Sequence, residues 1–155
     1  MELSAGTPAT KPLSVGMRRM LLVASALVFI VGIQLFVLSE QTDRYFAWTV
    51  APPLTAAFLG AAFWAAGILE LLAARQRVWA SARIAVPAVL LFTTLTLLAT
   101  LLHLDRFHLD TASGWVWLAV YAAVPPVMLA LFVRQLRVPG GDPPRRAPLP
   151  RWPSA

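Results

Sequence analysis

The chain has no cysteine, and only 13% of its residues are charged. Without thiols it can form no disulfide, thiolate metal site or thiol-redox centre, which excludes the cysteine-dependent four-helix oxidoreductases that act on quinones. The charged share is about half that of a soluble domain, where it is about 25%. A water-soluble core cannot hide the 59% of residues that are hydrophobic in a chain of 155 residues, so we expect lipid to cover part of them.

The chain has instead four apolar runs, each long enough to cross a membrane. They are Met20–Leu38, Leu54–Ala74, Ile84–Leu102 and Trp115–Val133. A bilayer core about 30 Å thick requires about 20 helical residues. The first run is longer than the apolar segment of a signal peptide, which has about 7–15 residues, so we expect it to be retained. The sequence predicts an all-α membrane four-helix bundle over residues 18–137, a disordered tail over residues 1–17, and a disordered Pro/Arg-rich tail over residues 138–155.

The positive charges favour one side of this bundle. All but two of the thirteen Lys and Arg residues lie before the first run, between the second and third, or after the fourth; Arg44 and Arg106 are the exceptions. The positive-inside rule then predicts that both termini are cytoplasmic. Twelve of the thirteen are Arg, a bias typical of GC-rich bacterial genomes, which predicts the bacterial plasma membrane. We interpret the net charge of +6 as a face toward anionic lipid headgroups, and we expect no nucleic-acid partner.

Two external loops share an Asp-Arg-aromatic string. Asp43 and Arg44 begin the string after the first run, and Asp105 and Arg106 begin it after the third. The match could reflect a parallel duplication of two helical hairpins, or convergence, because both loops need an anchor at the membrane interface. In either case we expect these four residues to anchor the loops.

The strings DRYFAWTVAPPLTAAFLGA and LLHLDRFH resemble small four-span integral membrane proteins of actinobacteria and their relatives. The resemblance covers about residues 18–137. It implies a four-span fold and a host group, and it brings no activity with it.

Glu70 is the only acidic residue within an apolar run, about one turn from the cytoplasmic end of the second. Ionisable groups at membrane depth are costly and are candidates for function. Glu70 could pair with Arg75, Arg77 or Arg83 near the interface, and this is the interpretation that we favour. The alternative is a small transporter that uses Glu70 to couple a proton or cation.

Polar side chains follow one face of the third run, from Thr93 to His103, within an arc of about 80°. They could line a small pocket that opens outward, together with residues of the fourth run. Alternatively, the threonines bond to carbonyls of their own helix. The candidate ligand-pocket residues are Thr96, Thr100, His103, Trp117 and Tyr121.

His103 and His108 lie close to Asp105 and Asp110 in the second external loop. Histidine and aspartate sets can bind metal, and two histidines could ligate haem. However, a spacing of five residues suits neither a helical chelate nor a haem held between facing helices. We therefore predict no metal, no cofactor and no catalytic residue, and keep a haem- or metal-binding membrane enzyme as an alternative.

Small residues gather on one face of the second run, where Gly60 and Gly67 stand among alanines. Such a face lets two helix backbones approach closely, either within the chain or in a homo-oligomer. In the fourth run, Pro125 and Pro126 remove two helical hydrogen bonds and predict a kink. The function that we favour is a non-enzymatic accessory, scaffold or small-ligand-binding membrane protein.

Overall fold

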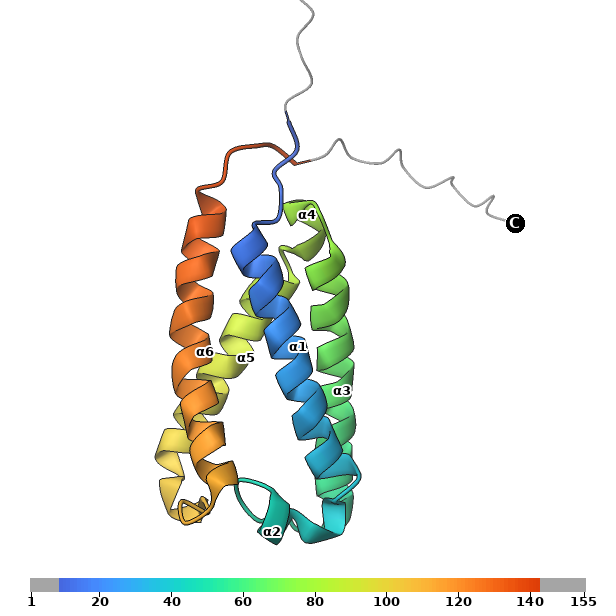
Figure 1. Cartoon of the computed structure of the whole chain (residues 1–155), viewed down its shortest axis with the longest axis vertical. Helices are drawn as coiled ribbons and strands as arrows, with labels where there is room; N and C mark the ends of the chain where they lie inside the picture. Colours follow the sequence, from blue (N-terminus) through green and yellow to red (C-terminus); the bar gives the residue numbers. More distant parts are fainter. Residues whose placement is uncertain (1–8, 143–155) are drawn as a thin grey trace, which may run out of the picture.

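The structure, a computed structural model, describes residues 9–142 as a bundle of long helices (Figure 1). The long helices are α1 (Val15–Phe36), α3 (Pro53–Arg75), α5 (Ala85–Leu102) and α6 (Ala112–Leu136), and the short ones are α2 (Thr42–Tyr45) and α4 (Trp79–Ala82). Four helical segments, α4 joining α5 in one of them, have mean hydropathies between 1.8 and 2.2 and the length to cross a membrane. The all-α four-helix bundle is confirmed, and it fits a multi-pass integral membrane protein.

The described structure begins before residue 18 and continues after residue 137, the limits predicted for the bundle. Helix α1 begins at Val15 because Ser14 caps it, accepting a hydrogen bond from the Met17 amide. Before the cap, the Lys11 amide donates to the Gly141 carbonyl at 2.9 Å. These tertiary hydrogen bonds give structure to segments whose composition alone indicates disorder. The predicted disorder of residues 1–8 and 143–155 lies outside the described residues.

The described ends of the chain lie together at one end of the bundle (Figure 1). The connection between α3 and α4 joins them there, because the Leu13 amide donates to the Arg77 carbonyl at 2.8 Å. Gln135 is fully buried at this end, where its side chain accepts from the Ser14 amide and donates to the Pro12 carbonyl. We call this the basic end. It carries eight described basic residues: Lys11, Arg18, Arg19, Arg75, Arg77, Arg83, Arg134 and Arg137.

The opposite end, which we call the acidic end, holds the two loops with the Asp-Arg strings. Its charged residues are Glu40, Asp43, Arg44, Asp105, Arg106 and Asp110. Helix α3 begins at this end with Pro53. Proline is tolerated there because backbone amides in the first turn of a helix have no hydrogen-bond partner within the helix. Helix α6 starts from Thr111, which accepts from the Gly114 amide, and it continues as one helix through Pro125 and Pro126. Helix α6 is thus continuous across the two prolines, and the predicted kink stays a prediction.

Helices α1 and α3 form the closest pair in the bundle. The hydroxyl of Ser25 donates to the Gly67 carbonyl at 2.8 Å, which is possible because Gly67 has no side chain in the way. The indole of Trp64 donates to the Phe29 carbonyl at 3.2 Å. Helix α5 packs mainly on α6. The bundle is thus built from two helix pairs, α1 with α3 and α5 with α6.

The glycine face of α3 packs against α1 of the same chain. A Cβ atom on Gly60 would lie 2.6 Å from the Phe36 amide nitrogen, and one on Gly67 would lie 3.0 Å from the Phe29 ring. Both glycines are buried. A second copy of the chain could use this face only by displacing α1, so the glycines provide an intrachain contact.

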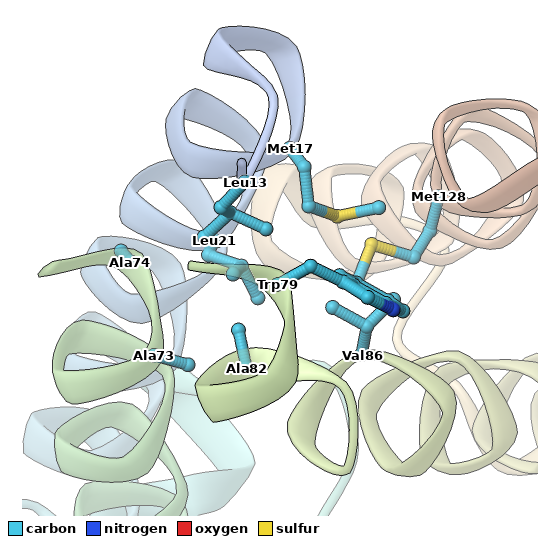
Figure 2. Close-up of a cluster of buried hydrophobic side chains, with 9 residues drawn as sticks. All are labelled: Leu13, Met17, Leu21, Ala73, Ala74, Trp79, Ala82, Val86 and Met128. Carbon is cyan, nitrogen blue, oxygen red and sulfur yellow. The ribbon is translucent and has the colours of Figure 1, made fainter. Parts of the chain in front are cut away.

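Two apolar clusters join the helix pairs, one at each end. At the basic end, Trp79 packs among residues from α1, α3 and α6 (Figure 2). This cluster consists of Leu13, Met17, Leu21, Ala73, Ala74, Trp79, Ala82, Val86 and Met128. The cluster at the acidic end consists of Leu35, Phe46, Ala47, Val50, Ala56, Phe63, Trp117 and Tyr121. The helix pairs leave a cavity between them, and its lining includes Phe46, Ala47, Trp117 and Tyr121 of the acidic-end cluster.

We expect Gly60→Val to destabilise the protein, because the added side chain overlaps the α1 backbone. Overpacking of this kind costs about 1–3 kcal/mol, and α1 can relieve it only by moving away from α3. Thermal unfolding in detergent measures the effect as a lower Tm. Ala61→Val, at the next and exposed position of α3, is the control and should leave Tm nearly unchanged. Equal Tm values for the two variants would contradict this account of the α1–α3 contact.

Candidate functional site

A central cavity of about 130 Å³ lies between the two helix pairs. All four long helices and the loop after α2 contribute to its wall, which is mostly apolar. It is lined by Ala24, Leu27, Val28, Ile30, Val31, Gln34, Phe46, Ala47, Ala66, Glu70, Phe92, Thr93, Ser113, Val116, Trp117, Val120, Tyr121 and Val124. A cavity of about 150 Å³ accepts a benzene molecule. This one, which is not fully enclosed, therefore holds about one aromatic ring, and further atoms of a larger molecule would lie in its opening.

Glu70 provides the one carboxylate in this wall. Its residue is only 5% exposed, and its Oε2 atom is buried with no hydrogen-bond partner within residues 9–142. It lies five residues before the end of α3, which is about 7.5 Å along the helix axis. Burying an ionisable group without a partner is costly. This feature therefore requires an explanation beyond packing.

The predicted ion pair of Glu70 with Arg75, Arg77 or Arg83 is wrong. The ion pairs in the described part of the chain are Arg83 with Asp142, at 2.7 Å, and Arg106 with Asp105, at 3.1 Å. The physical reason is the direction of Glu70 on its helix. It follows Phe63 and Gly67 at helical spacing on the buried face of α3, whereas Arg75 is exposed.

Apart from the Tyr121 hydroxyl, the other polar side chains of the cavity have hydrogen-bond partners within the described residues. Gln34 donates to the Tyr45 carbonyl at 3.1 Å, and Ser113 donates to the Phe46 carbonyl at 3.1 Å. Thr93 donates to the Val89 carbonyl of its own helix at 2.9 Å. Glu70 is the lining residue whose buried side-chain oxygen has no hydrogen-bond partner within residues 9–142, and we take it as the group that a ligand would contact.

The aromatic side of the cavity comes from α6. The rings of Trp117 and Tyr121 lie one helical turn apart with their centroids 4.4 Å apart, and both residues are 5% exposed. The Trp117 indole donates to the Thr100 hydroxyl at 3.1 Å, which fixes the ring. A flat apolar surface is thus held in the same wall as the carboxylate.

The cavity opens between α1 and α6. Three of its lining residues are exposed: Ile30 on α1 at 55%, Val116 on α6 at 59% and Phe92 on α5 at 48%. The first two border the space between α1 and α6. Both belong to helices long and apolar enough to span a membrane. A ligand would therefore reach the cavity sideways from lipid rather than from water.

The five residues predicted for a ligand pocket are divided between two hollows. Thr96, Thr100 and His103 line an open groove along α5 at the acidic end, Tyr121 lines the central cavity, and Trp117 lines both. In the groove, Thr96 donates to the Phe92 carbonyl and Thr100 to the Thr96 carbonyl. The threonines thus bond to carbonyls of their own helix, as the alternative interpretation of the stripe predicted. The central cavity is therefore the better candidate for a ligand site.

The two acidic-end loops are joined by residues other than the predicted anchors. Asp43 and Arg44 are exposed, and Asp105 pairs only with its neighbour Arg106. His108 makes the connection instead: its amide donates to the Ala47 carbonyl at 2.9 Å, and its ring lies 3.2 Å from the Thr49 hydroxyl. The Trp48 ring also packs on the rings of Phe107 and Trp117, with centroid distances of 5.0 and 4.9 Å.

His103 does not share a site with His108. Its Nδ1 atom lies 2.9 Å from the carbonyl of Ala99, one turn back on its own helix. Among residues 9–142, no group of three or more His, Cys, Asp or Glu side chains could hold a metal ion. The haem- or metal-binding enzyme thus gains no support from this geometry.

Glu70 also lines a second hollow, on the side of α3 and α5. This groove extends from Phe92 to Gln76 and Ser81 near the basic end, and it is bordered by the exposed side chains of Leu69 and Ile84. Ala66, Glu70 and Phe92 are common to both hollows. Glu70 therefore separates two hollows. One is the central cavity, which opens between α1 and α6, and the other is the groove on the side of α3 and α5.

Several residues of the cavity were not predicted as site residues. Gln34, Phe46 and Ser113 come from three segments far apart in the sequence, so no local pattern relates them. The direction of Glu70 had a signal: Gly60 and Gly67 precede it at helical spacing, and a face that packs closely on another helix is an interior face.

Comparison with protein-family models, with curated proteins and with solved structures finds no match. The resemblance to small actinobacterial membrane proteins therefore stays a prediction, and the function is argued from the residues of this chain.

Proposed function

We propose that this chain is a small-ligand-binding integral membrane protein whose ligand occupies the central cavity. The observation that supports this function is Glu70, a buried carboxylate with an unpartnered oxygen in the wall of a mostly apolar cavity. Ligand sites combine an apolar wall with a few polar groups that orient the ligand. Glu70 is such a group, and the rings of Trp117 and Tyr121 belong to the apolar part of the lining.

Filling the cavity should abolish binding. Ala24 is 6% exposed and lines the cavity, so Ala24→Leu places three more carbon atoms there. The probe is 1-tert-butyl-4-fluorobenzene, followed by ¹⁹F NMR with the full chain in lipid nanodiscs. We expect a bound resonance for the wild type, beyond partition into protein-free nanodiscs, and at least tenfold weaker binding for Ala24→Leu.

Ala26→Leu is the matched control, since it adds the same atoms at an exposed position two residues further along α1. It should bind the probe like the wild type. Wild-type protein that behaves like empty nanodiscs, or Ala24→Leu protein that binds as tightly as the control, would contradict the proposed site.

We assign the basic end to the cytoplasm of a bacterium and both termini with it. Eight described basic residues belong to that end and two to the other, a bias that the positive-inside rule associates with the cytoplasmic side. The same residues would contact anionic lipid headgroups.

The absence of cysteine makes the orientation simple to measure. Thr10→Cys at the basic end and Gln41→Cys at the acidic end are both exposed positions. With a membrane-impermeant maleimide on intact cells, we expect labelling of Gln41→Cys at once and of Thr10→Cys only after lysis. The reverse pattern would contradict the assignment.

A small transporter is the second candidate. It is favoured because Glu70 lines both hollows, the one that opens between α1 and α6 and the one on the side of α3 and α5. A carboxylate that lines both hollows could accept a proton from one hollow and release it into the other. Carboxylates at membrane depth serve as proton relays in pumps and transporters.

The transporter predicts a proton flux that depends on Glu70. Proteoliposomes with trapped pyranine, under an inside-negative potassium diffusion potential, should acidify faster than protein-free liposomes. Glu70→Gln should reduce the rate to that of protein-free liposomes, and Glu40→Gln, at an exposed acidic-end position, should keep it. A flux that persists in Glu70→Gln, or wild-type protein without flux, would end the transporter hypothesis.

A further inference from the structure

We propose that the ligand of the central cavity is an organic monocation, an amine or quaternary ammonium ion with an aromatic or alkyl body, and that Glu70 is its counter-ion. This inference rests on the proposed function and names the class of molecule that the same site binds.

The first argument is charge. None of the residues that line the cavity is a lysine, arginine or histidine. The arginine nearest to Glu70 in the sequence, Arg75, is exposed, and Arg83 is paired with Asp142. An ionised Glu70 therefore has no counter-charge in the described protein, and a buried charge is stable only when it is paired. A cationic ligand supplies the missing partner.

The second argument is the surface beside the carboxylate. Trp117 and Tyr121 on α6, Phe92 on α5 and Phe46 after α2 line the same cavity as Glu70. Aromatic faces attract cations, and quaternary ammonium ions are recognised by such rings. A carboxylate together with rings and aliphatic side chains matches a molecule that is charged at one end and apolar over the rest.

The third argument excludes other classes of ligand. A calcium ion needs about six to eight oxygen ligands, whereas the cavity offers one carboxylate among mostly apolar groups. The phosphate of a lipid headgroup would be repelled by an ionised Glu70. A wholly neutral ligand gives an ionised Glu70 no partner, so it would bind while a proton neutralises the carboxylate. An organic monocation needs no cage of oxygen ligands, is attracted by an ionised Glu70 and pairs with its charge.

The proton is the natural competitor of this ligand. When the cavity is empty, a proton on Glu70 removes the unpaired charge, and binding of a cation releases that proton one for one. The other titratable group in the wall is Tyr121 of α6; the lining residues from α1 and α5 include none, and the second hollow adds none. Affinity for a permanent cation should therefore weaken as the pH falls.

Two probes of the same shape separate charge from size. The cation (4-fluorophenyl)trimethylammonium has a nitrogen where neutral 1-tert-butyl-4-fluorobenzene has a carbon, and both are followed by ¹⁹F NMR with the full chain in nanodiscs of zwitterionic lipid. We expect the wild type to bind the cation at least tenfold more tightly than the neutral probe. Glu70→Gln should lose that preference and keep its affinity for the neutral probe, whereas Glu40→Gln should behave like the wild type.

The outcomes distinguish this inference from the function on which it rests. If the wild type binds the neutral probe as tightly as the cation, the monocation assignment is overturned and the ligand-binding function stands. If neither probe binds, the function itself fails. Should Glu70→Gln not fold, the pH dependence of the wild type decides: weaker cation binding at acid pH with constant neutral-probe binding supports the inference, and a flat profile for the cation overturns it.

Discussion

The close approach of α1 to α3 is the constraint on which the rest of the structure depends. With no side chain at Gly60 or Gly67, the backbones come near enough for Ser25 to reach a carbonyl of the opposite helix. Polar and van der Waals contacts of this kind drive helix association in lipid, where no hydrophobic force acts between helices. Because α5 packs mainly on α6, the two tight pairs meet chiefly through bulky side chains at their ends, and the space between them is left partly open in the middle.

Each end of the bundle joins the two pairs in a different way. At the basic end, hydrogen bonds from Gln135 and the backbone before α1 join three segments over the cluster around Trp79 (Figure 2). At the acidic end, Phe46 and Trp117 pack edge to face at 5.3 Å, and His108 ties the loops above them. Closed ends with an open middle direct access toward the sides, so lipid becomes the route by which a molecule reaches the interior.

The bundle could be predicted from the sequence because each span needs only length and apolar composition, and both are local properties. The site could be predicted only in part. The threonines of α5 form a stripe as expected, yet each hydroxyl bonds to its own helix, so the stripe describes α5 and not a pocket. Glu70 was assigned to the interface from its distance to Arg75, whereas its direction follows Gly67 into the interior. Distance along a helix is visible in a sequence, but direction depends on which face another helix covers.

That direction gives Glu70 its importance. A carboxylate at the same depth on the lipid side of α3 could extend toward the membrane–water interface and stay hydrated. On the interior side its Oε2 atom is buried and has no hydrogen-bond partner among residues 9–142, and the described lining of the cavity contains no basic side chain. A neutral side chain of the same size would remove this cost, so stability alone does not account for an acid at this position. The cost is offset only when something positive, a proton or a larger cation, occupies the space beside it, and the cavity between the helix pairs is where such a group fits.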